Sequence, residues 1–245
     1  MPRTALPSLL ATFAFAGAAQ AGVVVSYEAP GAQATTVGLQ AGGVETFSGR
    51  GSGSFTTTFG GSGFTGRYDN VQVLDADQYG GADGTGQYGA AFDQDGFSLT
   101  LTGGPASGAN YFGFWWSGVD WGNAVELFSN GVSIFRLGAA DVMASAVGAD
   151  GNWAYKGNPN APFKDWNYGE RYVFVNLVSD QAFDKVVFTG QYGGFETDNH
   201  TVGFAPLAGG GIAAVPEPAM WALMIGGFFG AGAMLRHRRR AIPAA

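Results

Sequence analysis

Short stretches in which apolar and polar residues alternate, separated by turns that contain glycine, restrict the fold of this chain more than any other feature. In the stretch FSLTLT at residues 97–102, three apolar side chains would share one face of a strand and three hydroxyl side chains the other. Side chains alternate between the two faces of a β-strand, so a period of two residues indicates a strand. The pattern therefore predicts strands with one buried face rather than amphipathic helices.

Further strands are predicted along the chain. Residues 132–135 and 172–175 are largely apolar on both faces, which is typical of central strands, and residues 185–189 form another strand. The turn signals Asn130-Gly131 and Asp150-Gly151 lie between such stretches. We expect residues 22–214 to form one all-β domain, an antiparallel β-sandwich with a jelly-roll-like arrangement.

Two segments of this body fit a sandwich less directly. Residues 139–147 could form a helical turn or two. Residues 49–66 are rich in glycine and serine, which fits either a flexible loop or a pair of edge strands. No long amphipathic helix is predicted within residues 22–214.

Composition excludes several classes of protein. The chain has no cysteine, which rules out disulfides and thiolate metal sites. Between residues 22 and 215 there are 18 acidic and 7 basic side chains, for a net charge of −11. Such a body repels phosphates and offers no basic stripe, so we expect no nucleic-acid partner.

Residues 1–21 have the three parts of a signal peptide. Arg3 supplies a positive charge, residues 9–18 are apolar, and Ala19-Gln20-Ala21 has small residues where signal peptidase requires them. We expect cleavage after Ala21, so that the mature chain begins near Gly22. The alternative is a buried N-terminal helix.

Residues 215–240 have the parts of a membrane anchor. An apolar run of 17 residues, 219–235, follows Pro216-Glu217-Pro218 and predicts a short transmembrane helix. A basic cluster comes after the run, made of Arg236, Arg238, Arg239 and Arg240. Because basic residues stay in the cytoplasm, the body should lie outside the inner membrane. An ordinary single-pass anchor is the alternative.

The tail resembles the PEP-CTERM sorting signal, in the variant with Trp-Ala after the Pro-Glu-Pro motif. Pro216, Glu217, Pro218, Trp221, Ala222 and the terminal arginines carry the resemblance, together with glycines 226, 227 and 232. Such tails imply cleavage by an exosortase, a membrane peptidase. The resemblance thus implies a transient inner-membrane anchor, then release to the cell surface or to an extracellular matrix such as that of a biofilm.

Several body segments also resemble one family of exosortase-dependent surface proteins. The matching stretches are residues 76–81, 110–115, 172–176, 183–188 and 194–202. The resemblance implies an exported β-sandwich but brings no activity with it. Tails of this kind also end some ice-binding proteins.

Acidic clusters provide candidate calcium ligands. One cluster contains Asp75, Asp77 and Asp83, and another consists of Glu196, Asp198 and Asn199 beside His200. Oxygen ligands in glycine-rich loops suit a structural calcium ion. The alternative is that these residues form turns by bonding to their own backbone. No other cofactor is expected.

Catalytic motifs are scarce. The body contains one histidine, His200, and no nucleophile motif, so we expect no catalytic residue and no enzyme activity. Residues 84–89 match G-x-G-x-x-G, but the sequence predicts a strand over residues 87–92, where a dinucleotide site needs a helix. A pair of carboxylates in a glycoside hydrolase remains an alternative, because such a pair forms only in space.

Tryptophans offer the last candidates. At least one of the neighbours Trp115 and Trp116 should enter the core. Trp121, Trp153 and Trp166 lie in loop-like contexts, where they could stack on sugars or anchor loops. We therefore expect a non-enzymatic surface or matrix protein that binds, at most weakly, an acidic or neutral exopolysaccharide. The alternatives are a carbohydrate-binding module, an ice-binding protein and a secreted glycoside hydrolase.

Overall fold

The structure, a computed structural model, describes residues 22–92, 96–105 and 108–206. The strands are β1 (Val23–Tyr27), β2 (Ala41–Glu45), β3 (Gly53–Thr57), β4 (Phe64–Asp75), β5 (Gln87–Ala91), β6 (Phe97–Gly103), β7 (Ala109–Ser117), β8 (Ala124–Ser129), β9 (Val132–Gly138), β10 (Tyr172–Phe183), β11 (Lys185–Thr189) and β12 (Phe195–Phe204). The helical elements in these ranges are α1 (Ala139–Ala144) and the 3-10 helices η1 (Phe59–Gly61), η2 (Ala82–Gly84) and η3 (Trp153–Tyr155). The all-β prediction is therefore confirmed.

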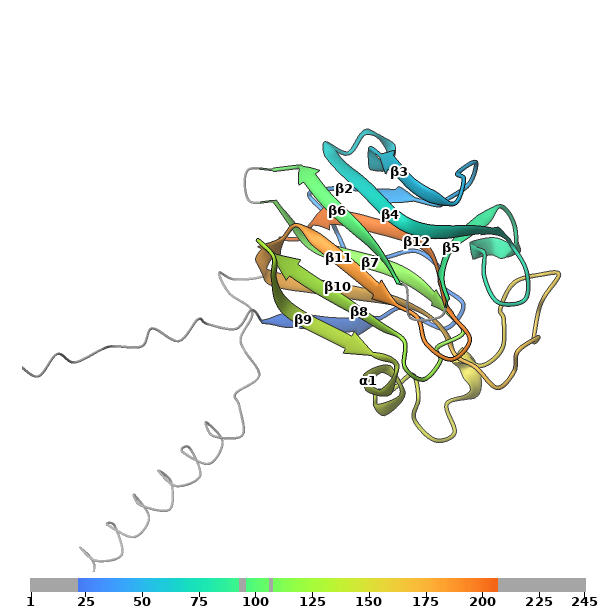
Figure 1. The fold of residues 1–245 in the computed structure, drawn as a ribbon. Helices are drawn as coiled ribbons and strands as arrows, with labels where there is room; N and C mark the ends of the chain where they lie inside the picture. Colours follow the sequence, from blue (N-terminus) through green and yellow to red (C-terminus); the bar gives the residue numbers. More distant parts are fainter. Residues whose placement is uncertain (1–21, 93–95, 106–107, 207–245) are drawn as a thin grey trace, which may run out of the picture.

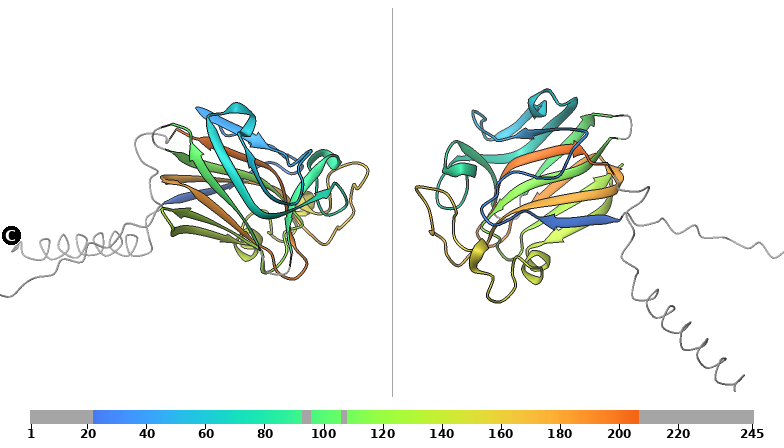
Figure 2. Two further views of the ribbon diagram at one scale, coloured as in Figure 1. Left: turned by 45° about the horizontal axis from the view of Figure 1, so that its top comes forward. Right: turned by 180° about the vertical axis from the view of Figure 1, so that it is seen from behind.

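All strand pairs are antiparallel, and the twelve strands belong to one continuous sheet (Figure 1). The strand order is β1-β10-β7-β12-β5-β4-β6-β11-β8-β9, with β2 paired to β12 and β3 paired to β4. The sheet folds back on itself into two packed layers and forms a nearly closed, barrel-like body (Figure 2). The two packed layers agree with the predicted sandwich, but they are joined through β4 and are not two separate sheets.

Strand β4 joins the two layers. Its first half, residues 64–69, pairs with β6, and its second half, residues 72–75, pairs with β5. Asn70 lies between the halves with a φ of 63°. Asparagine tolerates this left-handed conformation better than most residues, so it can redirect the strand from one layer to the other.

The predicted strands are present, with one error of placement. Strands β6, β10 and β11 cover the stretches predicted for them, and β10 lies centrally between β1 and β7. Strand β9, predicted as central, is the last strand in the order, and Val132 is exposed there. Apolar residues on both faces of a short stretch are therefore not enough to distinguish a central strand from an edge strand.

Local turn chemistry follows the sequence closely. Asn130 and Gly131 connect β8 to β9 as a two-residue turn with φ values of 50° and 79°. Two successive positive φ values are what a type I′ hairpin requires. Helix α1 supplies the predicted helical turns after β9, and the glycine-rich segment 49–66 contains β3, η1 and the start of β4.

Loops of functional interest gather at one end of the body, which we call the loop end. It consists of segments 118–123, 139–171 and 190–194, and Ser117 pairs there with both Tyr172 and Glu196. The described chain begins and ends at the opposite end, the terminus end. Gly22 bonds to Asp180 there, and the amide of Ala205 donates to the Oδ1 atom of Asn110 at 2.7 Å. In Figure 1 the loop end faces right and downward.

The two predicted tails, residues 1–21 and 215–240, lie outside the described residues, as do residues 207–214. Among the described residues, no helix combines the length and the apolar character needed to cross a membrane.

Candidate functional site at the loop end

Large aromatic side chains are exposed at the loop end. The exposed fractions are 69% for Trp121, 57% for Trp153, 54% for Trp166, 53% for Tyr168 and 84% for Tyr192. By contrast, both neighbours Trp115 and Trp116 are buried. Trp116 lies in the main core, and Trp115 packs on the outer face against Tyr172, where loops cover it. The three loop tryptophans are thus accessible to a ligand, whereas glycan stacking itself stays a prediction.

Segments 118–123 and 190–194 are fastened to each other. The amide of Gln191 donates to the Oδ1 atom of Asn123 at 2.8 Å, and the Nδ2 group of Asn123 donates to the carbonyl of Gly194. Gly122 has a φ of 87°, and a methyl group there would lie 2.8 Å from the Cβ atom of Gln191 and 3.0 Å from the ring of Tyr192. Glycine therefore allows the close approach of segment 118–123, which carries Trp121, to segment 190–194, which carries Tyr192.

Trp153 is already partly engaged by its own chain. Its ring is parallel to that of Tyr168, with centroids 6.4 Å apart, and the Nζ atom of Lys156 lies 4.1 Å from the Trp153 centroid and 5.7 Å from that of Tyr168. This is a cation–π arrangement. Trp121 has no such cation in the described part of the chain and presents more free surface.

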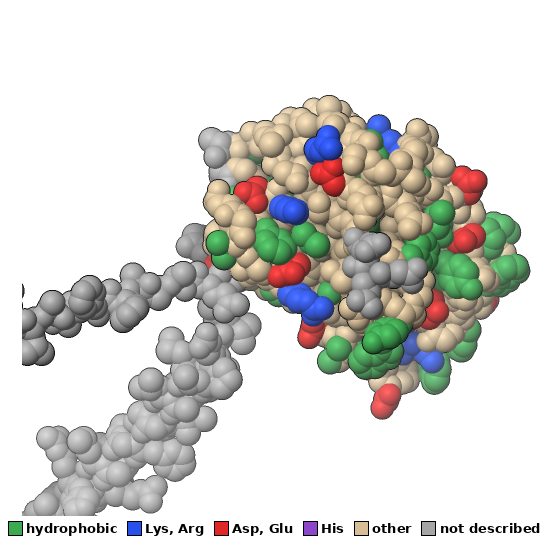
Figure 3. All heavy atoms as spheres, in the orientation of Figure 1, with side chains coloured by type: hydrophobic (Ala, Val, Ile, Leu, Met, Phe, Trp, Pro, Cys, Tyr) green, Lys and Arg blue, Asp and Glu red, His purple; other side chains and the backbone are tan. Residues whose placement is uncertain are grey.

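Three carboxyl groups at the loop end, those of Asp120, Glu170 and Glu196, lie close enough to influence one another electrostatically. Asp120 and Glu170 are half-buried, and Glu196 is only 5% exposed. A methyl group on Gly118 would lie 2.7 Å from the Oε2 atom of Glu170 and 3.9 Å from the Oε2 atom of Glu196. Both glutamates therefore lean over the same backbone position. On the face drawn in Figure 3, hydrophobic and acidic side chains lie next to each other on the right-hand side.

The surroundings of Asp120, Glu170 and Glu196 favour the protonated form of each carboxyl group. Burial, together with the charges of Asp120 and Glu170, raises the pKa of Glu196 to about 8. Burial and the charge of Asp120 raise the pKa of Glu170 to about 7, and burial raises the pKa of Asp120 as well. The ion pairs of the described residues are Arg50–Glu45 and Arg67–Asp69, so no basic side chain there is paired with these carboxylates. A carboxyl group without a counter-ion in a desolvated site retains its proton.

The second predicted calcium cluster anchors loops instead of forming a cage. Asp198 is buried, and its carboxylate accepts hydrogen bonds of 2.7 Å from the amides of Ala82 and Asn199. The Nδ2 group of Asn199 donates to the carbonyl of Gln33 at 2.8 Å. These two side chains thus tie segments 76–86 and 28–40 onto β12. Glu196 lies instead with Asp120 and Glu170, as described above.

The first cluster is also dispersed. Asp75 and Asp83 are exposed, whereas Asp77 accepts hydrogen bonds from the amides of Tyr79 and Gly80, as a turn-forming aspartate does. Within residues 22–92, 96–105 and 108–206, no three acidic or histidine side chains are grouped so that they could hold a metal ion. The turn-forming alternative fits this geometry, and calcium binding stays a prediction.

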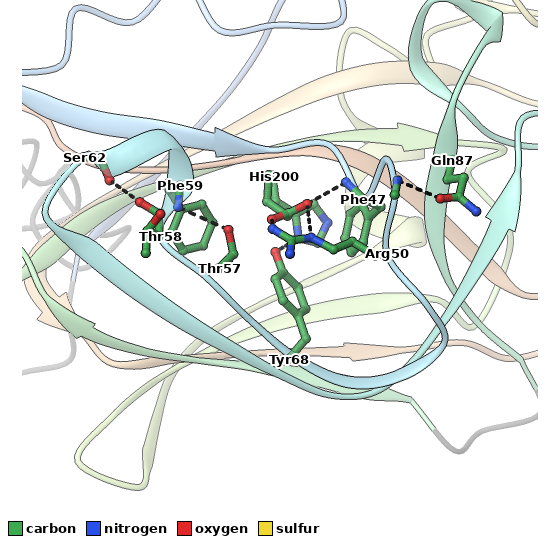
Figure 4. A network of polar contacts seen from close by, with 11 residues as sticks. Phe47, Arg50, Thr57, Thr58, Phe59, Ser62, Tyr68, Gln87 and His200 are labelled. Atoms are coloured by element: carbon green, nitrogen blue, oxygen red, sulfur yellow. Dashed lines mark hydrogen bonds and ion pairs between the residues drawn. The ribbon is translucent and has the colours of Figure 1, made fainter.

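His200 lies in the core and cannot reach a ligand at the surface. It is fully buried, and its Nδ1 atom is 2.8 Å from the hydroxyl of Tyr68 (Figure 4). Its Nε2 atom is 3.0 Å from the hydroxyl of Thr197. Burial lowers its pKa to about 3. The nearby ion pair of Arg50 with Glu45 fixes the segment that carries Phe47 into the core.

The match to G-x-G-x-x-G has a plain structural explanation. Strand β5 runs through its second half, from Gln87 to Ala91, so no helix follows to hold a pyrophosphate. The match is therefore accidental in a glycine-rich chain.

Sequence reasoning did not find Asp120, Glu170, Tyr168 or Tyr192. Their local sequence carries no motif, and they lie at one end of the body because the loops that carry them, segments 118–123, 139–171 and 190–194, all lie there. No protein-family model, no curated protein and no solved structure matches this chain. Function must therefore be inferred from the loop end itself.

Proposed function

We propose that this chain is an exported, non-catalytic surface protein whose loop end binds polysaccharide. The observation that carries the proposal is the gathering of exposed aromatic side chains, among them Trp121 and Tyr192, on loops at one end. Flat rings bury the C–H faces of sugars and lose little conformational entropy on binding, because an aromatic side chain has only two rotatable bonds. Single exposed apolar residues are ordinary, whereas a group of large ones marks an interaction site.

Export is part of the same proposal and rests on the tails. Signal peptidase would remove residues 1–21. Residues 215–240 would hold the body at the inner membrane through a short transmembrane helix, until an exosortase transfers it to the cell surface or matrix. Because Gly22 and Ala205 both lie at the terminus end, a chain held by its C-terminal tail would present the loop end away from the membrane.

The core position of His200 supports the non-catalytic part of the proposal. It is the one histidine between residues 22 and 214, and its ring is sealed among phenyl rings, so it cannot transfer protons to a bound sugar. Ice binding has less support. The outer face beside β6 carries the exposed ion pair of Arg67 with Asp69, which interrupts any regular array of threonines.

A glycan array probed with the mature protein tests the proposal. We expect binding that Trp121→Ala or Tyr192→Ala weakens. Replacement of Val132, an exposed apolar residue in the β8–β9 hairpin of the terminus end, by alanine should leave it unchanged. Failure to bind any polysaccharide would contradict the proposal.

Glycoside hydrolysis is the second candidate, because the structure brings Glu170 and Glu196 together. A protonated carboxyl beside an ionised one is the pair that such hydrolysis uses. Release of reducing ends from a bound polysaccharide, lost in Glu196→Gln, would favour this candidate over simple binding.

A further inference from the structure

The three carboxyl groups of Asp120, Glu170 and Glu196 have no positively charged partner among the described residues. Glu196 is nine-tenths buried, and within the described residues no side chain or amide of another residue donates a hydrogen bond to its carboxylate; only its own amide does. Its Oε2 atom points to the backbone of Gly118, the same place that the Oε2 atom of Glu170 approaches. The Glu196 oxygens are therefore left to accept hydrogen bonds from solvent or from a donor group of a ligand.

The groups that surround the Glu196 carboxylate are acidic or neutral. Asp120, Glu170 and Asp77 raise the pKa of Glu196 through their charges, and Asp77 also accepts a hydrogen bond from the hydroxyl of Tyr88. The nearby basic side chains are engaged elsewhere. Arg171 donates to the carbonyl of Val147 at 3.1 Å, and the ammonium of Lys156 lies against Trp153.

Aromatic surface adjoins the carboxylates. Trp121 follows Asp120 in the chain, and the Oδ2 atom of Asp120 is 3.5 Å from where a methyl group on Gly193 would lie, next to Tyr192. An ammonium group is attracted both to carboxylates and to the face of an indole ring. The contact of Lys156 with Trp153 shows that an ammonium packs on an aromatic ring at this same end of the body.

We infer that the loop end selects a polysaccharide that carries free amino groups, with its sugar rings on Trp121 and Tyr192 and an ammonium at Asp120, Glu170 and Glu196. The inference rests on the proposed polysaccharide binding and names its ligand class. It also revises the expectation of an acidic polymer, because like charges facing each other disfavour binding.

Calorimetry with two matched probes tests the inference: the hexamer of glucosamine and the hexamer of N-acetylglucosamine, at pH 7 and low salt. We expect the mature protein to bind the glucosamine hexamer about tenfold more tightly, a difference of about 1.4 kcal/mol. Binding of the glucosamine hexamer should change the number of bound protons, because an ammonium favours the ionised form of carboxyl groups that are partly protonated, whereas the acetylated hexamer carries no charge. The measured heat should therefore change with the ionisation enthalpy of the buffer.

Three variants and one control separate the contributions. Glu170→Gln and Glu196→Gln should reduce the preference to about twofold and leave the affinity for the acetylated hexamer unchanged. Trp121→Ala should weaken binding of both hexamers. Asp83→Asn is the matched control, because it removes one exposed charge at a position whose positive φ asparagine tolerates, and it should preserve the preference.

The outcomes are distinguishable. Equal affinity for the two hexamers, or tighter binding of an acidic polymer such as alginate, would overturn the amine inference and leave polysaccharide binding intact. Absence of binding to the hexamers and to every array glycan would overturn the proposed function as well. If Glu196→Gln fails to fold, Glu170→Gln still provides the test, because Glu170 is only half-buried. The melting curve of that variant shows whether it is folded.

Discussion

The hydroxyl of Tyr68 lies 2.8 Å from the Nδ1 atom of His200, and this contact joins the two layers of the body. Tyr68 comes from the half of β4 that pairs with β6, and His200 from β12 in the other layer. The ring of His200 stacks on Phe188 with centroids 4.8 Å apart and is surrounded by other phenyl rings. A neutral imidazole, with one donor and one acceptor nitrogen, is the form that suits this site.

Acid should destabilise the body through His200. Its folded pKa of about 3 lies below the unfolded value near 6.5, so the unfolded chain binds the extra proton first. The stabilising contribution is complete above pH 6.5 and is lost as the pH falls from there toward 3. We expect the ring signals of His200 in nuclear magnetic resonance spectra of residues 22–206 to stay unshifted down to pH 4.5. Titration of this ring near pH 6.5 in the folded body would contradict the burial.

Alkali should destabilise the body through Glu196, with the opposite sign. Its folded pKa of about 8 lies above the unfolded value, so the contribution is complete below about pH 4.5 and is lost as the pH rises toward 8. Glu196→Gln removes the penalty of ionising this group. At pH 8.5 we expect the variant to be more stable than the wild type by on the order of 2 kcal/mol, and the gap to close at pH 5. Denaturant unfolding at the two pH values measures both quantities.

Sequence periodicity predicted the elements of the fold better than their connection. Alternation identified β6 and β11, and the Asn130-Gly131 signal identified a hairpin, because both depend on residues that are neighbours in the chain. The passage of β4 from one layer to the other depends on Asn70 and on partners far away in sequence. That information is not contained in a local pattern, so a sandwich of two sheets was the natural expectation.

The candidate site shows the same division. Loop context indicated that Trp121, Trp153 and Trp166 would be exposed, and they are. The partners of Glu196 were predicted to be its neighbours Asp198 and Asn199. A register shift in the pairing of β12 with β7 lies between Asp198 and Thr201, and Asn199 has a φ of 51°. The side chains of Asp198 and Asn199 are thereby committed to loops, and Glu196 meets Glu170 and Asp120 instead.

Trp116 and Trp121 should respond differently to replacement by alanine. Trp116 is fully buried and stacks on Phe195 with centroids 4.6 Å apart, so Trp116→Ala should cost roughly 3–5 kcal/mol of stability. Trp121→Ala should leave the melting temperature nearly unchanged and weaken glycan binding by on the order of 1–3 kcal/mol, as loss of aromatic stacking does on other flat ligands. Thermal melts and a glycan titration on both variants measure this. Equal losses of stability would show that Trp121 is a structural residue.

Calcium is expected to leave the melting temperature unchanged if the acidic turns are structural. Asp198 accepts an amide hydrogen bond at each carboxylate oxygen, and the Oδ1 atom of Asp77 accepts bonds from the amides of Tyr79 and Gly80, so both carboxylates already have the partners of a loop anchor. An ion that binds only the folded state must raise stability in proportion to its concentration. Melts with millimolar calcium and with a chelator decide the question. A rise that Asp77→Asn abolishes would restore the calcium site.

Processing at both ends is the last prediction. Ala19 and Ala21 fit the pocket of signal peptidase, and the Pro216-Glu217-Pro218 motif precedes an apolar run and a basic cluster. Since proline cannot enter a helix interior, the segment before the run should be extended and accessible to a peptidase. Intact-mass measurement of protein released from cells should therefore show a chain that begins near Gly22 and lacks Arg236–Arg240. Replacing Pro216-Glu217-Pro218 by alanines should leave the uncleaved chain in the membrane fraction. Released protein that still carries the arginines would contradict the sorting proposal, while the loop end would keep its own tests.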